Sequence, residues 1–389
     1  MPEFPYSRLR RWPDVEAENL QAHDATDLLL VARALAEAGE RGLDGTQIAV
    51  IGDEYGAVTL ALTDAGLRGI RVHQDLATGR RALARNAADL GLDGFASHEL
   101  DAALLDGARL VLLQLPKALA ELEEIADAVA RWAATDVVLV AGGRVKHMVL
   151  AQNEVLGRSF SRVQAQRAER KSRLIVASEP RPVSETPPFP VSAQHEGLTL
   201  VAHGGAFAGA RLDIGTRVLL DALRLASRFL SEERSDETKG VREPGKDVLD
   251  LGCGTGALAV SYALAHPAAQ VIATDRSAAA VASARATAAA NGVADRITVT
   301  QDDAASEVAT ASVDVVLLNP PFHLGTSIHT GAATRLFEAA ARVLRPGGEL
   351  FTVFNSSLGY RAELTRLVGT TEQLHRTPKF TVTRSIRRP

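Results

Sequence analysis

Residues 247–265, "DVLDLGCGTGALAVSYALA", carry the clearest indication of the fold. The stretch begins as an apolar run that suits a buried strand, turns at closely spaced glycines and continues as an alanine-rich helical segment. A glycine turn at such a junction lets the backbone approach a ligand, with the amides at the start of the helix facing it. We therefore expect the first strand, loop and helix of an α/β nucleotide-binding sheet.

The sequence of this loop is compatible with two cofactors. Gly252, Gly254 and Ala257 satisfy the dinucleotide pattern, so an NAD enzyme is one interpretation. Gly256 adds a further glycine, and Asp250 lies two positions before the first one, where a carboxylate can receive the ammonium group of S-adenosylmethionine directly or through water. A pyrophosphate would be repelled by that charge. S-adenosylmethionine is therefore the predicted cofactor.

Two acids follow the next strands. Asp275 ends the second strand, 25 positions after Asp250, where a carboxylate can accept both ribose hydroxyls of either cofactor. Asp303 follows "RITVTQDD" and can accept the adenine amino group, with Asp302 the less suited neighbour. The alternative for each acid is a solvated strand end. Cys253 is interpreted as a small turn residue because no basic partner lies beside it in the sequence.

A proline pair marks the end of the fourth strand, in "LNPPFH" at residues 318–323. Two prolines end sheet pairing and hold the preceding Asn319 extended, so its side-chain oxygen and a neighbouring carbonyl can accept both hydrogens of an exocyclic amine. Phe322 offers a face for base stacking, which is worth about 1–3 kcal/mol. The predicted catalytic residues are Asn319, Pro320, Pro321 and Phe322. The alternative is a rigid turn without chemistry.

An internal repeat indicates two similar halves. "IAVIGDEYGA" from Ile48 lies 200 positions before "VLDLGCGTGA" from Val248, and the same offset pairs Asp75 with Asp275. With a small gap, "VLLQLPKAL" from residue 111 falls opposite "VLLNPPFHL" from residue 316. Three matches in one order predict a duplicated α/β domain; the alternative is the generic likeness of such folds.

The first copy has lost the residues that serve a cofactor. Val50, Asp53 and Glu54 stand where Asp250, Cys253 and Gly254 stand in the second copy, and Gln114 stands opposite Asn319. A second cofactor site is therefore not expected. The proline-rich stretch "SEPRPVSETPPFPVSAQ" suggests a linker, and we place the boundary near Pro187, giving domains of residues 1–186 and 187–389.

The composition of the chain limits which partners and ligands it can bind. With 43 basic and 47 acidic side chains the net charge is −4, so a nucleic acid would need local basic patches. The candidates are Arg8, Arg10 and Arg11; Arg167, Arg170, Lys171 and Arg173; and Arg384, Arg387 and Arg388. One cysteine excludes an internal disulfide, and no Cys/His spacing suggests a metal. Without an apolar signal or spanning segment, we expect a soluble cytoplasmic monomer.

The motifs "VLDLGCGTG" and "NPPFH", with the upstream "GGAFAGARLDIGTRVLL", resemble the ribosomal RNA guanine-N2 methyltransferases of the RlmG and RsmC type. The resemblance implies two tandem Rossmann-like class I methyltransferase domains. It further implies that the N-terminal copy has lost cofactor binding and helps to recognise RNA, while the C-terminal copy methylates guanine. "LLQLPKALAELE" and "FNSSLGYRAELTRLVG" are more similar to the large-subunit branch than to the small-subunit one.

The resemblance also implies site residues. Asn319, Pro320, Pro321 and Phe322 correspond to the amine clamp, and Gly252, Gly254, Gly256 and Asp275 to the cofactor site. A motif before the first strand, expected near the cofactor, contributes Asp213, Gly215 and Thr216 to cofactor binding and Phe207, with Phe322, to substrate binding. The charged insert at residues 231–246 departs from the family pattern and is expected to be a surface loop.

Other functions remain open at this point. An adenine amino group or a glutamine side chain is also a planar amine, and similar Asn-Pro-Pro pairs serve both; the two-copy architecture argues against them. A base within a duplex cannot reach such a pocket, so a nucleic-acid target must be unpaired or flipped out. A catalytically silent RNA-binding or ribosome-assembly module would require loss of cofactor binding, against which the intact second-half motifs count.

Overall fold

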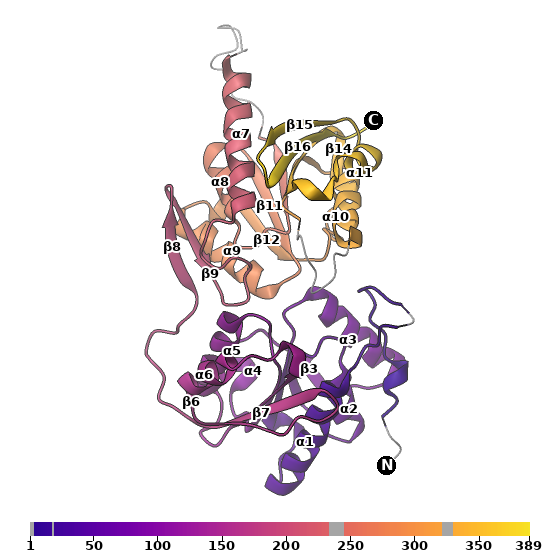
Figure 1. Ribbon diagram of the computed structural model, residues 1–389, viewed down its shortest axis with the longest axis vertical. Coiled ribbons are helices and arrows are strands. Elements are labelled where there is room, and N and C mark those ends of the chain that lie inside the picture. The colour runs from indigo at the N-terminus through magenta and orange to yellow at the C-terminus, as the bar shows by residue number, and fades with distance from the viewer. Residues whose placement is uncertain (1–3, 18, 233–244, 321–329) are drawn as a thin grey trace. The chain divides into compact units, whose positions relative to one another are not determined.

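The computed structural model describes residues 4–17, 19–232, 245–320 and 330–389 (Figure 1). The chain divides into two compact units, Met1–Pro190 and Val191–Pro389, which we describe separately. The charged insert predicted as a surface loop lies largely outside the described residues, as do Pro321 and Phe322. No helix within the described ranges combines the length and apolar character needed to cross a membrane.

Unit 1 is built on a sheet of seven described strands in the order β3-β2-β1-β4-β5-β7-β6. The strands are β1 (Ile48–Ile51), β2 (Ile70–His73), β3 (Phe95–Ser97), β4 (Leu110–Gln114), β5 (Val138–Arg144), β6 (Phe160–Ala165) and β7 (Ser172–Pro180). The helices are α1 (Ala25–Arg41), α2 (Ala57–Asp64), α3 (Ala77–Leu90), α4 (Ala102–Leu105), α5 (Leu119–Trp132) and α6 (Ala151–Ser159).

Unit 2 begins with a two-stranded ribbon, β8 (Val191–His195) and β9 (Leu198–Ala202), before its main sheet, ordered β12-β11-β10-β13-β14-β16-β15. Those strands are β10 (Asp247–Leu251), β11 (Gln270–Asp275), β12 (Ile297–Gln301), β13 (Val313–Leu318), β14 (Leu344–Asn355), β15 (Thr371–Arg376) and β16 (Phe380–Ile386). The helices are α7 (Ile214–Glu232), α8 (Ala257–Ala265), α9 (Ala278–Ala290), α10 (Thr330–Val343) and α11 (Arg361–Leu367).

The two main sheets have the same strand order, which confirms the predicted duplication of a Rossmann-like domain. Their registers agree with the sequence alignment as well. In unit 1 Val50 pairs with Leu112, and in unit 2 Asp250 pairs with Leu317. Gln114 and Asn319 therefore occupy the same position, at the carboxyl end of the fourth strand of each sheet. The gap assumed in aligning the two halves is thus correct.

Each sheet is covered on both faces, which explains its apolar strands. Along β1, Ile48 and Val50 pack with α1, α2 and α3 on one face, while Ala49 and Ile51 pack with α4, α5 and α6 on the other. In unit 2 the corresponding faces are covered by α7, α8 and α9 and by α10 and α11. Asp250 is a carboxylic acid between the buried apolar residues Leu249 and Leu251 of β10, so it requires a specific partner.

That partner is the start of the next helix. Asp250 Oδ2 accepts the Ala259 N–H at 2.9 Å, and Ala259 is the third residue of α8. In unit 1 Val50 cannot do this, but Asp53 Oδ2 accepts the N–H of Thr59, the third residue of α2, at 2.7 Å. A carboxylate satisfies a free amide and complements the helix dipole at either site. The degenerate copy has therefore moved its helix cap from the strand into the loop.

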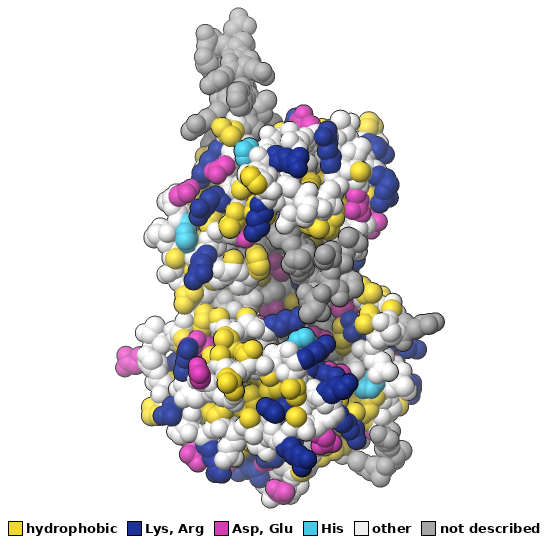
Figure 2. All heavy atoms as spheres, in the orientation of Figure 1, with side chains coloured by type: hydrophobic (Ala, Val, Ile, Leu, Met, Phe, Trp, Pro, Cys, Tyr) yellow, Lys and Arg dark blue, Asp and Glu magenta, His cyan; other side chains and the backbone are white. Residues whose placement is uncertain are grey.

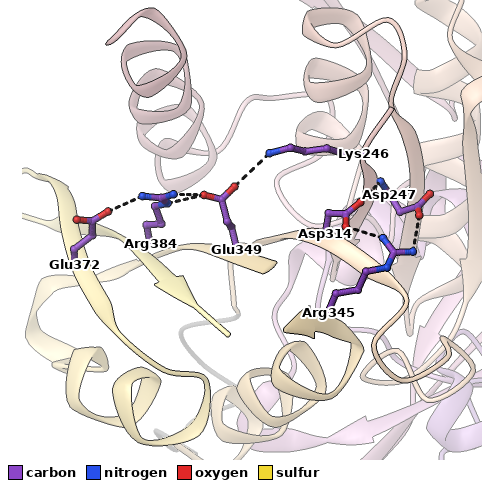
Figure 3. Close-up of polar contacts among 7 residues, drawn as sticks. All are labelled: Lys246, Asp247, Asp314, Arg345, Glu349, Glu372 and Arg384. Atoms are coloured by element: carbon purple, nitrogen blue, oxygen red, sulfur yellow. Dashed lines mark hydrogen bonds and ion pairs between the residues drawn. The ribbon is translucent and has the colours of Figure 1, made fainter. Parts of the chain in front are cut away.

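A network of ion pairs lies at the amino-terminal edge of the unit 2 sheet, where its parallel strands begin (Figure 3). This edge is opposite the one that carries the glycine loop. Arg345 contacts Asp314 at 2.7 Å and Asp247 at 2.8 Å, which joins the starts of β10, β13 and β14. Burial opposes the effect, but the Arg345 guanidinium lowers the pKa of Asp314 below its ordinary value. These contacts hold the sheet from its amino-terminal edge and leave the carboxyl edge for the glycine loop.

We predict that Asp53→Asn stabilises unit 1 at alkaline pH. Burial raises the pKa of Asp53, so the folded state binds this proton more tightly than the unfolded chain, and stability falls as pH rises above about 4. Asparagine keeps an acceptor for Thr59 without a buried charge. The expected gain is on the order of 1 kcal/mol at pH 8, shrinking toward pH 4.

Chemical denaturation followed by tryptophan fluorescence measures this gain, because both tryptophans, Trp12 and Trp132, belong to unit 1. A variant that is less stable than the native protein at pH 8 would show that the ionised carboxylate is needed as the cap.

Candidate active site

The glycine loop between β10 and α8 forms an open cradle at the carboxyl edge of the unit 2 sheet. The amides of Gly252 and Cys253 donate to the Thr274 carbonyl of β11 at 2.8 and 2.9 Å, which anchors the loop. Gly252 and Gly254 have positive φ angles of 76° and 54°, and a methyl carbon added to either would meet no atom of the described residues within 4 Å. The loop therefore faces open space that a ligand can fill.

Asp275 connects this loop to the start of α9. Its Oδ2 accepts the Gly254 N–H and its Oδ1 accepts the Ser277 N–H, both at 2.9 Å. A carboxylate has lone pairs beyond these two bonds, and the side chain is only half-buried. The geometry suits the predicted role of accepting ribose hydroxyls beside the glycine loop.

Asp250 has one oxygen committed and one available. Oδ2 caps α8, whereas Oδ1 is buried and has no donor among the described residues. Burial raises the pKa of Asp250 to about 7, the Ala259 N–H opposes this rise, and the charge of Asp275 adds to it. A cationic group near Oδ1 would satisfy the oxygen and favour its ionised form. The site therefore fits the ammonium group of S-adenosylmethionine.

Two other loop predictions have different outcomes. Burial raises the pKa of the Cys253 thiol well above its ordinary value, which agrees with its interpretation as an unreactive turn residue. Asp303 is buried and forms an ion pair with Arg335 of α10. Asp302 accepts the Glu307 N–H at 2.8 Å in its own turn. The adenine contact assigned to Asp303 thus stays a prediction, and its carboxylate is already oriented by Arg335.

Asn319 lies at the end of β13 and contacts the start of α7. Its Nδ2 donates to Asp213 Oδ2 at 3.1 Å and to Thr216 Oγ1 at 3.0 Å. Its Oδ1 is buried and has no donor among the described residues. A Cβ on Gly215 would lie 3.2 Å from this Oδ1, so glycine permits the close approach. The structure brings Asn319, Asp213, Gly215 and Thr216 together, as members of one cluster.

The remaining predicted site residues are placed in part. Pro320 is buried directly after Asn319, while the loop that continues through Pro321 and Phe322 is outside the described residues. Phe207 lies in the connection between β9 and α7, and its side chain is 70% exposed. An exposed aromatic ring on the segment that leads to Asp213 is available for stacking, and this role stays a prediction.

Unit 1 lacks the cradle. A Cβ on Gly52 would lie 3.3 Å from the Gln114 carbonyl oxygen, so the space that is open above Gly252 is occupied here. Asp53 is fully buried in place of Cys253, and the side chain of Gln114 donates to Asp27 of α1. Gln114 thus narrows the space above Gly52, whereas no described atom lies within 4 Å of the corresponding position at Gly252.

The three candidate basic patches differ in what their cations bind. In the C-terminal patch Arg384 pairs with Glu349 and Glu372 (Figure 3). Arg387 and Arg388 donate to backbone carbonyls. In the N-terminal patch Arg8 and Arg11 also bind backbone carbonyls. The cations of the patch at residues 167–173 lie at an exposed hairpin. Figure 2 shows Lys and Arg side chains mixed with Asp and Glu on the drawn face, so local geometry must select a binding surface.

Sequence reasoning missed three contacts. Ser277 was detectable, because a serine before a helical run is a common N-cap, and its Oγ accepts the Ala280 N–H at 3.1 Å. The Arg335 pair with Asp303 and the Asn319 contacts with α7 had no local signal. They join residues 32 and more than 100 positions apart, which only the folded sheet brings together.

Asp250 predicts a pH-dependent cofactor affinity. Since the bound cofactor's cation favours the carboxylate, affinity for S-adenosylmethionine should rise as the pH passes from 6 to 8 through the pKa of about 7. Asp250→Asn should flatten this rise and weaken binding about tenfold or more at pH 8, because a charged hydrogen bond is lost.

Isothermal titration of both proteins at several pH values measures the effect. The cofactor's own amino group also titrates near pH 8, and its loss of charge would weaken binding to the native protein more than to the variant. The two curves are therefore compared below pH 8, where the cofactor stays cationic. Parallel curves would assign the pH dependence to another group.

Comparison with known proteins shows which protein families the chain resembles. The family model described as RLMG N-terminal domain matches residues 3–181, and the one described as Methyltransferase small domain matches residues 197–384. Among solved structures, the T. thermophilus 16S rRNA N2 G1207 methyltransferase (RsmC), in complex with AdoMet and guanosine, has a TM-score of 0.70 at 23% identity, covering 94% of this chain and 92% of that one. This likeness confirms the predicted class I methyltransferase fold.

Curated relatives are similar over nearly the whole length. The ribosomal RNA large subunit methyltransferase G of Streptomyces coelicolor is 35% identical, covering 97% of both chains. The protein of the same name from Pseudomonas aeruginosa is also 35% identical, covering 98% of this chain and 99% of the relative. The chain therefore belongs to the family of ribosomal RNA large subunit methyltransferase G, with an RLMG N-terminal domain followed by a methyltransferase small domain.

Proposed function

We propose that this protein transfers the methyl group of S-adenosylmethionine to the exocyclic N2 amine of a guanine in large-subunit ribosomal RNA. The names of its full-length relatives support the RNA and the subunit. The observation that carries the chemistry is Asn319, on the sheet edge that also bears the glycine loop. Its amide is held at the start of α7, and its buried Oδ1 has no donor in the part of the chain that the structure describes. An acceptor in this position suits a hydrogen-bond-donating amine.

The residues perform positioning rather than strong base catalysis. The bound cofactor supplies an electrophilic methyl group on a sulfonium. Asn319 Oδ1 and a neighbouring main-chain carbonyl accept the two amine hydrogens and direct the nitrogen lone pair toward the methyl carbon. As the N–C bond forms and the C–S bond breaks, the nitrogen becomes acidic and its proton leaves late. An amide is a poor base, so this proton passes to solvent.

The two units divide the work in this proposal. Residues 187–389 form the catalytic domain, and residues 1–186 form a recognition domain that binds ribosomal RNA but no cofactor, in agreement with the filled edge of unit 1. The protein acts as a monomer in the cytoplasm, where its RNA substrate is made. Small-subunit RNA is the second candidate substrate, because the structural relative RsmC is a 16S rRNA methyltransferase. At 23% identity that likeness supports the fold alone.

Asn319→Ala should reduce methyl transfer at least 10²-fold while changing cofactor affinity less than twofold, because positioning of the amine is lost and the glycine loop is untouched. The assay supplies radiolabelled S-adenosylmethionine to unmodified large-subunit RNA, small-subunit RNA and total protein, followed by nucleoside digestion. Label in N2-methylguanosine from large-subunit RNA is expected.

Other labelling patterns would change the conclusion in defined ways. Label only in small-subunit RNA would move the substrate to the other subunit, and label in methyladenosine or protein would overturn the guanine assignment. Loss of cofactor binding in the Asn319→Ala variant would mean that Asn319 belongs to the cofactor site.

The β6–β7 hairpin is the RNA contact that the structure of unit 1 favours. Its tip residues Arg170 and Lys171 have positive φ angles of 48° and 64°, while Glu169 and Ser172 exchange two backbone hydrogen bonds of 2.8 Å. Such a turn prefers glycine or asparagine, so two cationic residues here cost on the order of 1 kcal/mol each. Conformational strain that presents two cations is typical of a functional tip.

The neighbouring loop extends this surface, which we call the basic hairpin surface: Arg170 and Lys171 with Lys146 and His147. The Val145 N–H donates to the Lys171 carbonyl at 3.0 Å, which joins the tip to the exposed turn Val145–His147. Neither Lys146 nor Lys171 has an ion pair within the described ranges, and Leu150 beside them is 83% exposed. Free cations beside an apolar side chain suit RNA phosphate and base contacts.

The double variant Lys146→Gln/Lys171→Gln should weaken binding to unmodified large-subunit RNA and lower the slope of log affinity against log salt by about 1 to 2, because up to two phosphate contacts disappear. Arg33→Gln/Arg158→Gln is the matched control. It removes the same charge from unit 1 at residues that are paired with Glu37 and Glu123. Filter binding at several salt concentrations measures both, and equal slopes would exclude this surface.

A further inference from the structure

The amide of Asn319 has a preferred orientation that its own chemistry does not impose. A free asparagine can present either its oxygen or its NH₂ group to a substrate. Here Nδ2 donates to Asp213 Oδ2 and to Thr216 Oγ1, so the NH₂ group faces α7. Rotating the amide by half a turn would place Oδ1 against Asp213 Oδ2, and two acceptors would repel each other.

Asp213 is itself held in place. Its Oδ2 also accepts the N–H groups of Gly215 and Thr216, at 2.9 and 3.2 Å, at the start of α7. This Asp213 oxygen accepts three N–H groups and has no hydrogen to donate. It therefore cannot bind Asn319 Oδ1, which is also an acceptor. The close packing depends on Gly215, since a Cβ there would lie 3.0 Å from Asp213 Oδ2 and 3.2 Å from Asn319 Oδ1. The helix start therefore acts as a rigid support for the amide.

Unit 1 offers an internal comparison. Gln114, in the position of Asn319, also donates its side-chain amide to a carboxylate of the first helix, Asp27. That acid lies inside α1, where Asp24 is the N-cap and Asp27 completes the capping box by accepting the Asp24 N–H at 2.7 Å. In unit 2 the residue before α7, Asp213, likewise binds both the helix start and the amide. Since a carboxyl–amide link also exists in the copy without the Asn-Pro-Pro-Phe motif, a test must separate orientation from structural support.

We propose that Asp213, assisted by Thr216, is a positioning residue that orients Asn319 so that only its oxygen faces the substrate, and thereby selects a hydrogen-bond-donating amine over a carbonyl at the same position. The inference rests on the proposed function and adds a specificity determinant to it. It gives these two residues a role beyond the cofactor site in which the resemblance placed them. A base with oxygen in place of the amine would face Asn319 Oδ1 with a second acceptor and be rejected.

Asp213→Asn is the discriminating variant. Asparagine is as good a helix cap as aspartate, so α7 is preserved, but its amide can face either orientation of Asn319. We expect kcat to fall about 10²-fold, with cofactor Kd and the unfolding midpoint nearly unchanged. Guanosine and xanthosine, which has a carbonyl at C2, serve as competing inhibitors. The native protein should prefer guanosine, and the variant should lose most of that preference.

Three controls accompany this variant. Asp221→Asn makes the same substitution on an exposed residue of α7, where the carboxylate only meets Arg224 at 3.5 Å, and should leave every readout unchanged. Thr216→Ser retains the hydroxyl acceptor and should restore the activity that Thr216→Val loses. In a double-mutant cycle, Asp213→Asn should have little further effect on kcat in the Asn319→Ala background, because both act through one amide.

The outcomes distinguish this inference from the proposed function. Unchanged kcat and an unchanged guanosine preference in Asp213→Asn would overturn the positioning role. Weaker cofactor binding in proportion to the lost activity would make Asp213 a cofactor residue, and a lower unfolding midpoint in that proportion would make it structural. If the native protein labels another base, the proposed function fails, and the loss in Asp213→Asn is then measured on that base, where it tests the orientation independently.

Discussion

In each unit a carboxylate accepts an amide of the helix that follows the first strand of the main sheet. The nucleotide-binding edge depends on this contact. Asp250 crosses from the buried strand β10 to the third amide of α8, so the glycine loop between them must fold over the sheet edge. Because only one oxygen is used, the second is left buried with its charge uncompensated, and burial raises the pKa to about 7. An element that stabilises the loop therefore also favours a cationic ligand.

The two copies place this carboxylate at different positions in the chain. In unit 1 the cap moves to Asp53, the strand position becomes Val50, and the cradle above Gly52 is occupied. The seven-stranded topology is the same in both units. In both copies a carboxylate accepts an amide at the helix start, but only in unit 2 does that carboxylate come from the strand, beside open glycines.

A second helix start, that of α7, holds the proposed substrate side of the site. Asp213 binds two amides of its own helix and the amide of Asn319 on β13, so one oxygen joins helix and sheet. Helix starts thus organise both halves of the proposed reaction: one orients the cofactor's carboxylate partner, and the other orients the amine's acceptor. In both cases free backbone amides hold a carboxylate whose position the reaction requires.

Local patterns in the sequence were sufficient for the fold, the duplication, the cofactor loop and the Asn319 motif. Strand periodicity, glycine spacing and proline pairs act on neighbouring residues, so they can be recognised without the fold. The sequence could not show that Asp303 pairs with Arg335, that Asp53 replaces Asp250 as a cap, or that Asp213 holds Asn319. Those contacts join elements far apart in the chain, and only the register of the parallel strands sets which side chains meet at the sheet edge.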